Sequence, residues 1–99
     1  MRSLRQEKKK SSKRGSSYKP LVPAVDQASR ILMCLGNASG FKMGVIEISK
    51  EVGIHKSKGF SILNTLNQFG FVEKDPQTKT YSLGPGLLFL AVNFQIFWN

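Results

Sequence analysis

The chain has 99 residues and is 40% hydrophobic, which is enough for one small core and too little for a large multidomain enzyme. Its formal net charge of +9 favours a polyanionic partner, either a nucleic acid or an acidic membrane surface. One Cys and one His are too few for a disulfide or a four-ligand zinc site, so we expect no metal and no cofactor. We expect a cytoplasmic protein, because the N-terminus lacks a signal-type apolar segment and no apolar stretch reaches the length that spans a bilayer.

Most of the positive charge lies in the first 19 residues, which hold eight Lys and Arg and one acid, Glu7. With only Leu4 and Tyr18 to bury, this basic tail is predicted to be disordered. Two interpretations of the tail remain open. It is either a solvated, idle segment or an arm that adds DNA affinity by releasing counterions from phosphates.

Two helices are predicted after the tail. Apolar residues recur at three- and four-residue spacing over Val25–Leu35, and we expect Gly36 to end this first helix. A second, shorter helix is predicted over Val45–Val52, with Gly53 as its end. Only a tight turn fits between Gly53 and the next helical segment.

A third helix and a hairpin follow that turn. The third helix is predicted over Lys56–Phe69, with Gly70 as its end signal. Phe71–Glu73 and Thr80–Leu83 are predicted strands, joined by a proline-containing turn over Asp75–Lys79. The predicted fold is therefore mainly α, a three-helix winged helix-turn-helix with a two-stranded β-hairpin wing and a C-terminal linker helix.

The C-terminal helix is predicted to begin at Pro85, because Pro is well tolerated at the first helical position. The segment from Leu87 to Trp98 is apolar nearly all round, so one face of this small domain cannot cover it. A partner subunit or a further domain is the first interpretation, and interfacial membrane contact is the second. The residues predicted to support a homodimer are Val25, Leu32, Phe94 and Phe97.

The polar face of the third helix is the candidate interface with double-stranded DNA. The apolar stripe of this helix consists of Ile62, Leu63, Leu66 and Phe69. The opposite face is polar with little charge, whereas an idle solvated face, the alternative, would more often carry Glu and Lys. We expect Asn64 at a base edge and Ser57 at a phosphate, since Asn hydrogen-bonds adenine well and Ser is permissive. The predicted DNA-binding residues are Lys56, Ser57, Lys58, Phe60, Ser61, Asn64, Gln68 and Lys79.

Phe60 does not fit a simple polar face, because it lies roughly 130° from the centre of the apolar stripe on a helical wheel. Its ring either contacts a thymine methyl or sugar edge, or it packs inward because the helix is distorted near Gly59. Both explanations remain open.

Several short motifs occur in one order along the chain with matching gaps. They are Val25–Ala28, Arg30–Leu32, Glu47–Ser49, Gly53–Ser57, Gly70–Glu73, Asp75–Pro76 and Tyr81–Pro85. Over residues 22–90 the chain thereby resembles the IclR family of bacterial transcription regulators. The resemblance implies a dimeric winged helix-turn-helix that binds a pseudo-palindromic operator and is normally followed by a larger ligand-sensing domain.

Three positions depart from the pattern of that family. Family members usually carry a long polar residue where this chain has Ser61. They usually carry an apolar residue where it has Gly59, and we expect this glycine, in the interior of a helix, to weaken the helix by about 1 kcal/mol. They commonly have Gly where Lys79 stands; if the backbone there is left-handed, Lys79 is mildly strained while it gains a charge near phosphate.

The sequence thus predicts a disordered basic tail over 1–19, a DNA-binding domain over 20–84 and an apolar dimerisation helix over 85–99, with the effector-binding domain absent. Such a chain is a fragment, a truncated product or a regulator that borrows a sensor. The predicted function is sequence-specific DNA binding without catalysis, because no nucleophile and acid accompany His55. The alternative is a module that binds nucleic acid nonspecifically or only dimerises.

Overall fold

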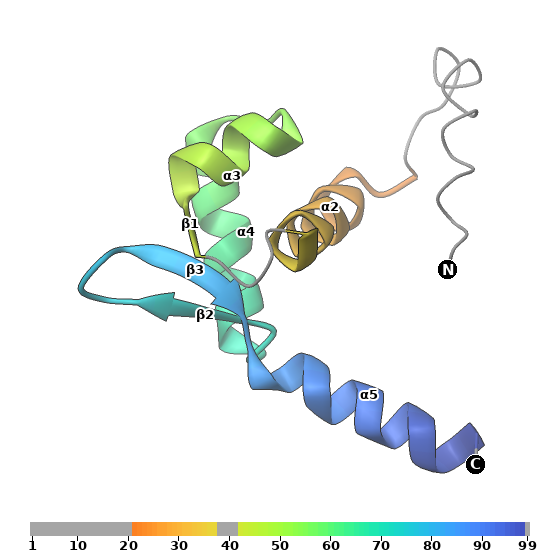
Figure 1. Cartoon of the computed structure of the whole chain (residues 1–99). Helices are drawn as coiled ribbons and strands as arrows, with labels where there is room; N and C mark the ends of the chain where they lie inside the picture. The colour runs from red at the N-terminus through yellow and green to blue at the C-terminus, as the bar shows by residue number, and fades with distance from the viewer. Residues whose placement is uncertain (1–20, 38–41, 99) are drawn as a thin grey trace.

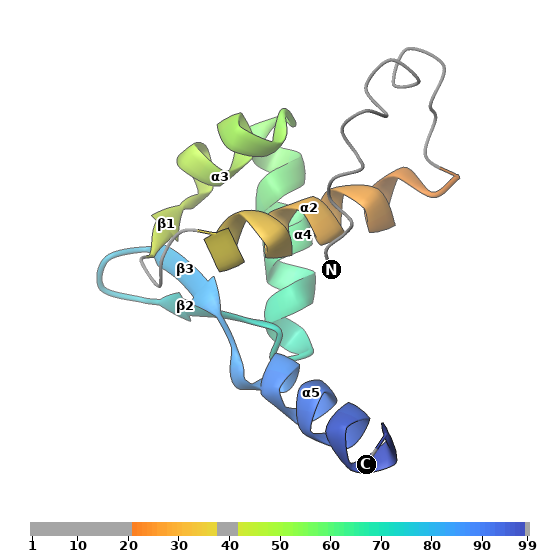
Figure 2. The ribbon, with the colours of Figure 1, turned by 45° about the vertical axis from the view of Figure 1, so that its right-hand side comes forward.

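The computed structural model describes residues 21–37 and 42–98, with the backbone alone for 95–98; the predicted basic tail lies outside the described residues. The elements in chain order are α2 (Pro23–Asn37), β1 (Met43–Gly44), α3 (Val45–Val52), α4 (Lys56–Gln68), β2 (Val72–Asp75), β3 (Thr80–Leu83) and α5 (Pro85–Trp98). Helices α2, α3 and α4 pack together, the sheet lies beside them, and α5 leads away from this body (Figures 1 and 2). The fold is the predicted three-helix winged helix-turn-helix with a C-terminal helix.

One small core joins the three packed helices to the sheet. It is formed by the buried residues Ile31, Leu35, Ile48, Ile62, Leu63, Leu66, Val72 and Tyr81. Helices α2 and α4 contribute core residues at three- or four-residue spacing and α3 contributes Ile48, so one face of each of these three helices is buried and the other faces solvent. The face of α4 opposite the core is therefore free to contact a partner.

Helix α2 extends beyond the predicted helix at both ends. It begins at Pro23, where the missing N–H of proline costs nothing, and it runs through Gly36 to Asn37. The prediction that Gly36 ends the helix was wrong. A glycine ends a helix when it adopts a left-handed backbone, and among the described glycines only Gly53 and Gly70 have a positive φ.

Those two glycines produce the turns on either side of α4. Gly53 has a φ of 82°, and the backbone N–H of Gly53 and of Ile54 both donate to the Ser49 carbonyl, at 2.8 and 3.0 Å. These two hydrogen bonds end α3 at the predicted residue, and the chain then turns into α4. Gly70, with a φ of 78°, then turns the chain from α4 into β2.

Helix α4 ends at Gln68, one residue earlier than predicted, and Phe69 caps it. The placement of Phe69 on the buried stripe was wrong, because its side chain is 67% exposed. The turn at Gly70 begins before the ring reaches the core. Phe69 instead stacks on Phe71, with ring centroids 5.8 Å apart.

The sheet has three strands, in the order β1-β3-β2, where a two-stranded hairpin was predicted. β3 matches its prediction, and β2 covers Val72–Asp75 instead of Phe71–Glu73. The unpredicted strand β1 pairs antiparallel with β3, Met43 opposite Tyr81 and Gly44 opposite Thr80. This pairing anchors the chain entering α3 to the wing strand β3, so the helix-turn-helix and the wing form one structure.

Candidate nucleic-acid interface

All eight residues predicted to bind DNA are exposed on α4 or at the wing. The helix buries Ile62, Leu63 and Leu66, so its outer surface is left to polar side chains. Asn64 and Gln68 are exposed to solvent, whereas Lys58 and Ser61 also border an apolar groove under α2. The structure thus presents seven of the predicted residues on α4, with part of this set turned toward α2, and the eighth, Lys79, at the wing.

Asn67, although exposed, makes a contact that supports the fold. Its side-chain N–H donates to the backbone carbonyl of Val72 at 2.8 Å, which joins the end of α4 to the start of β2. Asn64 and Asn67 are both exposed, but of the two only Asn67 has a hydrogen bond that joins the helix to the wing.

Phe60 points toward the wing. Its side chain is 44% exposed, and the ammonium of Lys74 on β2 lies 5.5 Å from the ring centroid and 5.6 Å from that of Tyr81. The inward packing considered for Phe60 was therefore wrong. A cation over two aromatic faces stabilises the contact between helix and wing. Lys74 was missed from sequence, since nothing local distinguishes it from any strand lysine.

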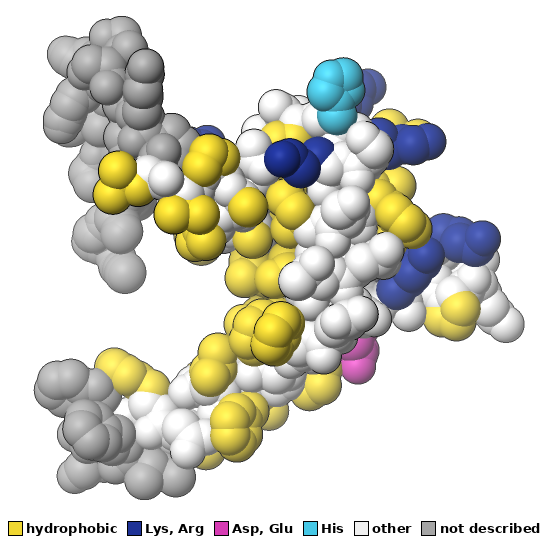
Figure 3. Space-filling view, turned by 180° about the vertical axis from the view of Figure 1, so that it is seen from behind, with side chains coloured by type: hydrophobic (Ala, Val, Ile, Leu, Met, Phe, Trp, Pro, Cys, Tyr) yellow, Lys and Arg dark blue, Asp and Glu magenta, His cyan; other side chains and the backbone are white. Residues whose placement is uncertain are grey.

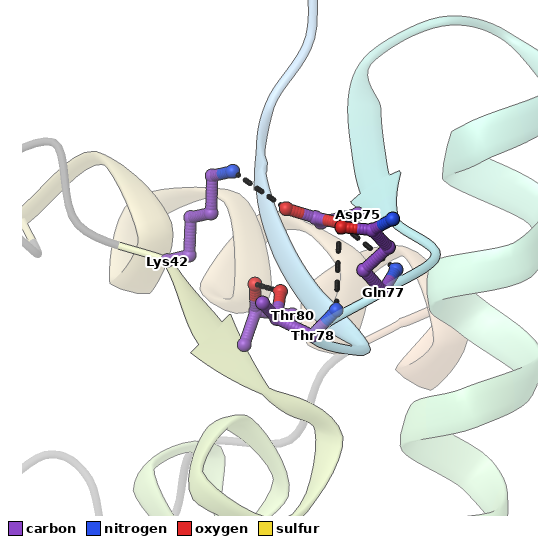
Figure 4. Close-up of polar contacts among 5 residues, drawn as sticks. All are labelled: Lys42, Asp75, Gln77, Thr78 and Thr80. Atoms are coloured by element: carbon purple, nitrogen blue, oxygen red, sulfur yellow. Dashed lines mark hydrogen bonds and ion pairs between the residues drawn. The ribbon is translucent and has the colours of Figure 1, made fainter.

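The tip of the wing is organised by Asp75 (Figure 4). One carboxylate oxygen accepts a hydrogen bond from Lys42 Nζ at 3.0 Å, and the other accepts from the backbone N–H groups of Gln77 and Thr78 at 2.9 and 3.4 Å. The Lys42 hydrogen bond, followed by the two backbone donors, lowers the pKa of the Asp75 carboxyl. Asp75 thereby fixes the turn from which Lys79 projects.

Lys79 has a left-handed backbone, with a φ of 61°. Its backbone N–H donates to the Asp75 carbonyl at 2.7 Å, which closes the turn. Beside it, the hydroxyls of Thr78 and Thr80 lie 2.7 Å apart. The tip therefore presents an exposed ammonium from a turn that is held by several hydrogen bonds.

Charge and apolar surface are separated on the molecule. Lys and Arg side chains gather around the part formed by α3, α4 and the wing, and hydrophobic side chains gather along α2 and α5 (Figure 3). The first turn of α4 contains no acid. A cationic helix-and-wing surface suits a phosphate backbone, and the apolar side suits another protein surface.

The residues predicted to support a dimer lie on the apolar side. Val25 is 62% exposed, Leu32 is half-buried and Phe94 is 61% exposed, whereas the side chain of Phe97 lies outside the described part. A groove of about 460 Å³ runs between α2 and α4. Its apolar lining consists of Ala24, Val25, Ala28, Leu32, Ile62, Leu66 and Phe71.

The described part of the chain shows no sign of a metal site or a membrane-spanning helix. Its His, Cys, Asp and Glu residues form no group of three that would hold a metal ion, and none of its helices is long and apolar enough to cross a membrane. Cys34 is half-buried with its Sγ 3.7 Å from Met43 Sδ. Burial, followed by the nearby Glu51 and Glu47 carboxylates, raises the pKa of the Cys34 thiol, which makes it a weak nucleophile.

Three packed helices, an exposed polar α4 and a cationic wing define a winged helix-turn-helix domain. Residues 24–76, more than half of the chain, match the IclR helix-turn-helix domain, and the chain belongs to this family. It is 33% identical over 69 residues to the HTH-type transcriptional regulator XynR of Escherichia coli (strain K12), covering 70% of this chain and 27% of that protein. It is 32% identical over 73 residues to the glycerol operon regulatory protein of Streptomyces coelicolor, covering 74% of this chain and 28% of that protein.

Solved structures agree with this assignment. An IclR transcriptional regulator from Alicyclobacillus acidocaldarius superposes with a TM-score of 0.69 at 36% sequence identity, over 76% of this chain and 29% of that one. An IclR family regulator from Brucella abortus gives a TM-score of 0.67 at 25% identity, over 74% and 28% of the two chains. This chain thus spans less than a third of the length of these relatives.

Proposed function

We propose that this chain is the sequence-specific DNA-binding module of a bacterial transcription regulator, without catalytic activity and acting in the cytoplasm. The observation that carries the proposal is the outer surface of α4, which is exposed and polar and has no acid in the first turn of the helix. The opposite face of the same helix is buried in the core. Such a helix fits the major groove, and a wing beside it reaches the neighbouring backbone. Family membership supports the same conclusion.

The roles of the exposed residues follow from their chemistry. Asn64, in the middle of α4, is proposed to hydrogen-bond a base edge, and Ser57, in the first turn, to donate to a phosphate. Lys79 at the wing tip is proposed to contact the phosphate backbone. The remaining proposed contacts, to phosphates, sugars or base edges, come from Lys56, Lys58, Phe60, Ser61 and Gln68.

A competition experiment tests this function. Duplexes selected from a random library by the whole chain should stay bound in excess random DNA. The Asn64→Ala variant should lose about 1 to 3 kcal/mol on the selected site and little on random DNA, while Ser57→Ala should weaken both. Equal loss on both DNAs for Asn64→Ala would contradict base reading. No preference by the unmodified chain would favour nonspecific binding, and no binding at all would favour a dimerisation module.

We further propose that residues 20–84 form the DNA-binding domain, that 85–99 form a linker helix, and that two copies assemble through their apolar sides. Helix α5 carries large exposed apolar residues, among them Leu88 at 65% and Phe89 at 67% exposure. A homodimer would cover these residues and would place two copies of α4 at half-sites about 34 to 36 Å apart.

The oligomeric state tests the assembly. Replacing Leu88 and Phe89 by Ser should raise the monomer fraction in sedimentation and weaken binding to a two-half-site duplex. The matched control is Ile46→Ser, because Ile46 is 58% exposed on α3, away from the apolar side. A soluble monomer of the unmodified chain that still binds two half-sites tightly would rule out this assembly.

A further inference from the structure

An aromatic side chain lies on the otherwise polar exposed surface of α4. Phe60 is 44% exposed, and the exposed residues one turn away on either side, Ser57 and Asn64, are both polar. Because residues three and four apart are neighbours on a helix surface, the ring adjoins both side chains proposed to contact DNA. The fold therefore leaves an apolar group open to any partner that reaches this part of α4.

The ring of Phe60 is held from the wing. The Lys74 ammonium lies 5.5 Å from the centre of the Phe60 ring and 5.6 Å from the centre of the Tyr81 ring. Lys74 and Tyr81 are directly opposite each other on β2 and β3, and Tyr81 is buried in the core. The cation thus belongs to a strand pair that is anchored in the core. Its attraction for the face of the ring limits the positions that Phe60 can take.

This contact places the ring in the corner between α4 and the wing. The β2–β3 hairpin lies beside α4 (Figures 1 and 2), and Asn67, two turns along from Phe60, donates to the Val72 carbonyl on β2. Lys58 and Ser61 instead border the apolar groove under α2. A duplex that receives α4 in its major groove and also touches the wing would therefore cover the Phe60 ring.

Thymine is the base whose major-groove edge matches an apolar ring. It alone presents a methyl group in that groove, whereas the other groups on the base edges are hydrogen-bond donors and acceptors, which a phenyl ring cannot satisfy. Asn64, one turn further along α4, suits adenine. Four residues of helix rise about 6 Å, which corresponds to roughly two base-pair steps of about 3.4 Å each.

We propose that Phe60, positioned by Lys74, selects the C5 methyl group of a thymine within about two base pairs of the base that Asn64 contacts. The proposal rests on the DNA-binding function proposed above and adds a specificity-determining contact to it. Lys74 is a positioning residue, because it acts on the thymine through the ring of Phe60.

Deoxyuridine tests the methyl contact, because it lacks only the C5 methyl group of thymidine. The duplex selected by the whole chain is remade with one thymine at a time replaced by deoxyuridine, and each affinity is compared with that of the parent duplex. At one thymine per half-site the unmodified chain should lose about fourfold in affinity, the effect of losing one buried methyl-sized group. In Phe60→Ala the same replacement should have no effect.

Phe69→Ala is the matched control. It also removes an exposed aromatic ring, at the end of α4, but one that stacks on Phe71 and has no contact with Lys74. This variant should keep the fourfold effect of deoxyuridine. The readout is a ratio of two affinities measured on one protein, so a change in stability or in attraction to phosphate cancels from it.

The same ratio tests the role of Lys74. Lys74→Gln removes the cation and should reduce the effect of deoxyuridine to about twofold or less. Lys74→Arg should retain the full effect, because a guanidinium also binds the face of an aromatic ring. An unchanged ratio in Lys74→Gln would show that the lysine does not position the ring.

Three results would overturn the thymine contact. They are a selected site without thymine, a site in which every thymine tolerates deoxyuridine, and a methyl effect that persists in Phe60→Ala. Equal losses on both duplexes in Phe60→Ala would mean that the ring touches a sugar instead of a base. All of these results leave the proposed function standing, whereas a chain that selects no DNA sequence at all would refute that function itself.

Discussion

Replacing Gly59 by Ala tests the packing of α3 against α4. Gly59 lies inside α4, where helix propensity alone favours Ala by about 1 kcal/mol. The structure predicts the opposite result. A Cβ atom at position 59 would collide with the Ser49 hydroxyl oxygen, which is buried between the two helices. The next-nearest atom, Ser49 Cβ, would be 3.5 Å away, which is ordinary van der Waals contact.

The magnitude follows from these two effects. Overpacking a buried contact costs about 1 to 3 kcal/mol, so Gly59→Ala should lower the free energy of unfolding by about 0 to 2 kcal/mol once the propensity gain is included. Ser49→Ala removes both the colliding atom and an unpaired buried hydroxyl, so it should stabilise the chain by about 1 kcal/mol. In that background Gly59→Ala should add about 1 kcal/mol more, which gives a coupling energy of about 1 to 3 kcal/mol.

Urea unfolding followed by far-UV circular dichroism measures all four chains of this double-mutant cycle. Thermal melts provide a second reading, because 1 kcal/mol shifts the midpoint by about 4 to 8 °C in a domain of this size. If Gly59→Ala stabilises equally with and without the Ser49 hydroxyl, the two positions are uncoupled and the close approach of α3 and α4 is wrong.

Three further predictions concern the wing and the tail. Asn67→Ala should destabilise the fold by about 0.5 to 1.5 kcal/mol through loss of its bond to Val72, and unchanged urea midpoints would contradict this. The pKa of Asp75 is lowered in the folded state, so the ionised carboxylate stabilises the fold at neutral pH, and this stabilisation is lost as the pH falls from about 4 through the lowered pKa. The difference in stability between the unmodified chain and Asp75→Asn should therefore shrink over this pH range, which thermal melts at several pH values measure. Deleting residues 1–19 should flatten the salt dependence of DNA affinity while leaving the melting temperature unchanged, and an equal slope would mean that the tail does not touch phosphate.

Local signals in the sequence were sufficient for much of this protein. The bounds of α3, the start of α4 and the proline that opens α5 were all predicted, because caps, prolines and helical periodicity act within a few residues. The resemblance to the IclR family drew attention to Lys79, at a position where the family commonly has Gly, and its backbone is left-handed. The exposed face of α4 followed from the apolar stripe on its other side. The residues on this face could therefore be identified from the sequence alone.

Tertiary structure decided the features that depend on residues far apart in the chain. Strand β1 has two residues, too few for any periodic pattern, and it exists because Met43 and Gly44 pair with β3. Gly59 looked like a weakness of α4, and only the position of Ser49 shows that close helix packing requires it. The contact of Phe60 with Lys74 likewise depends on how the wing lies against the helix. Sequence periodicity fixes which face of an element is buried, whereas the identity of the neighbour on that face is set by the packing of the whole chain.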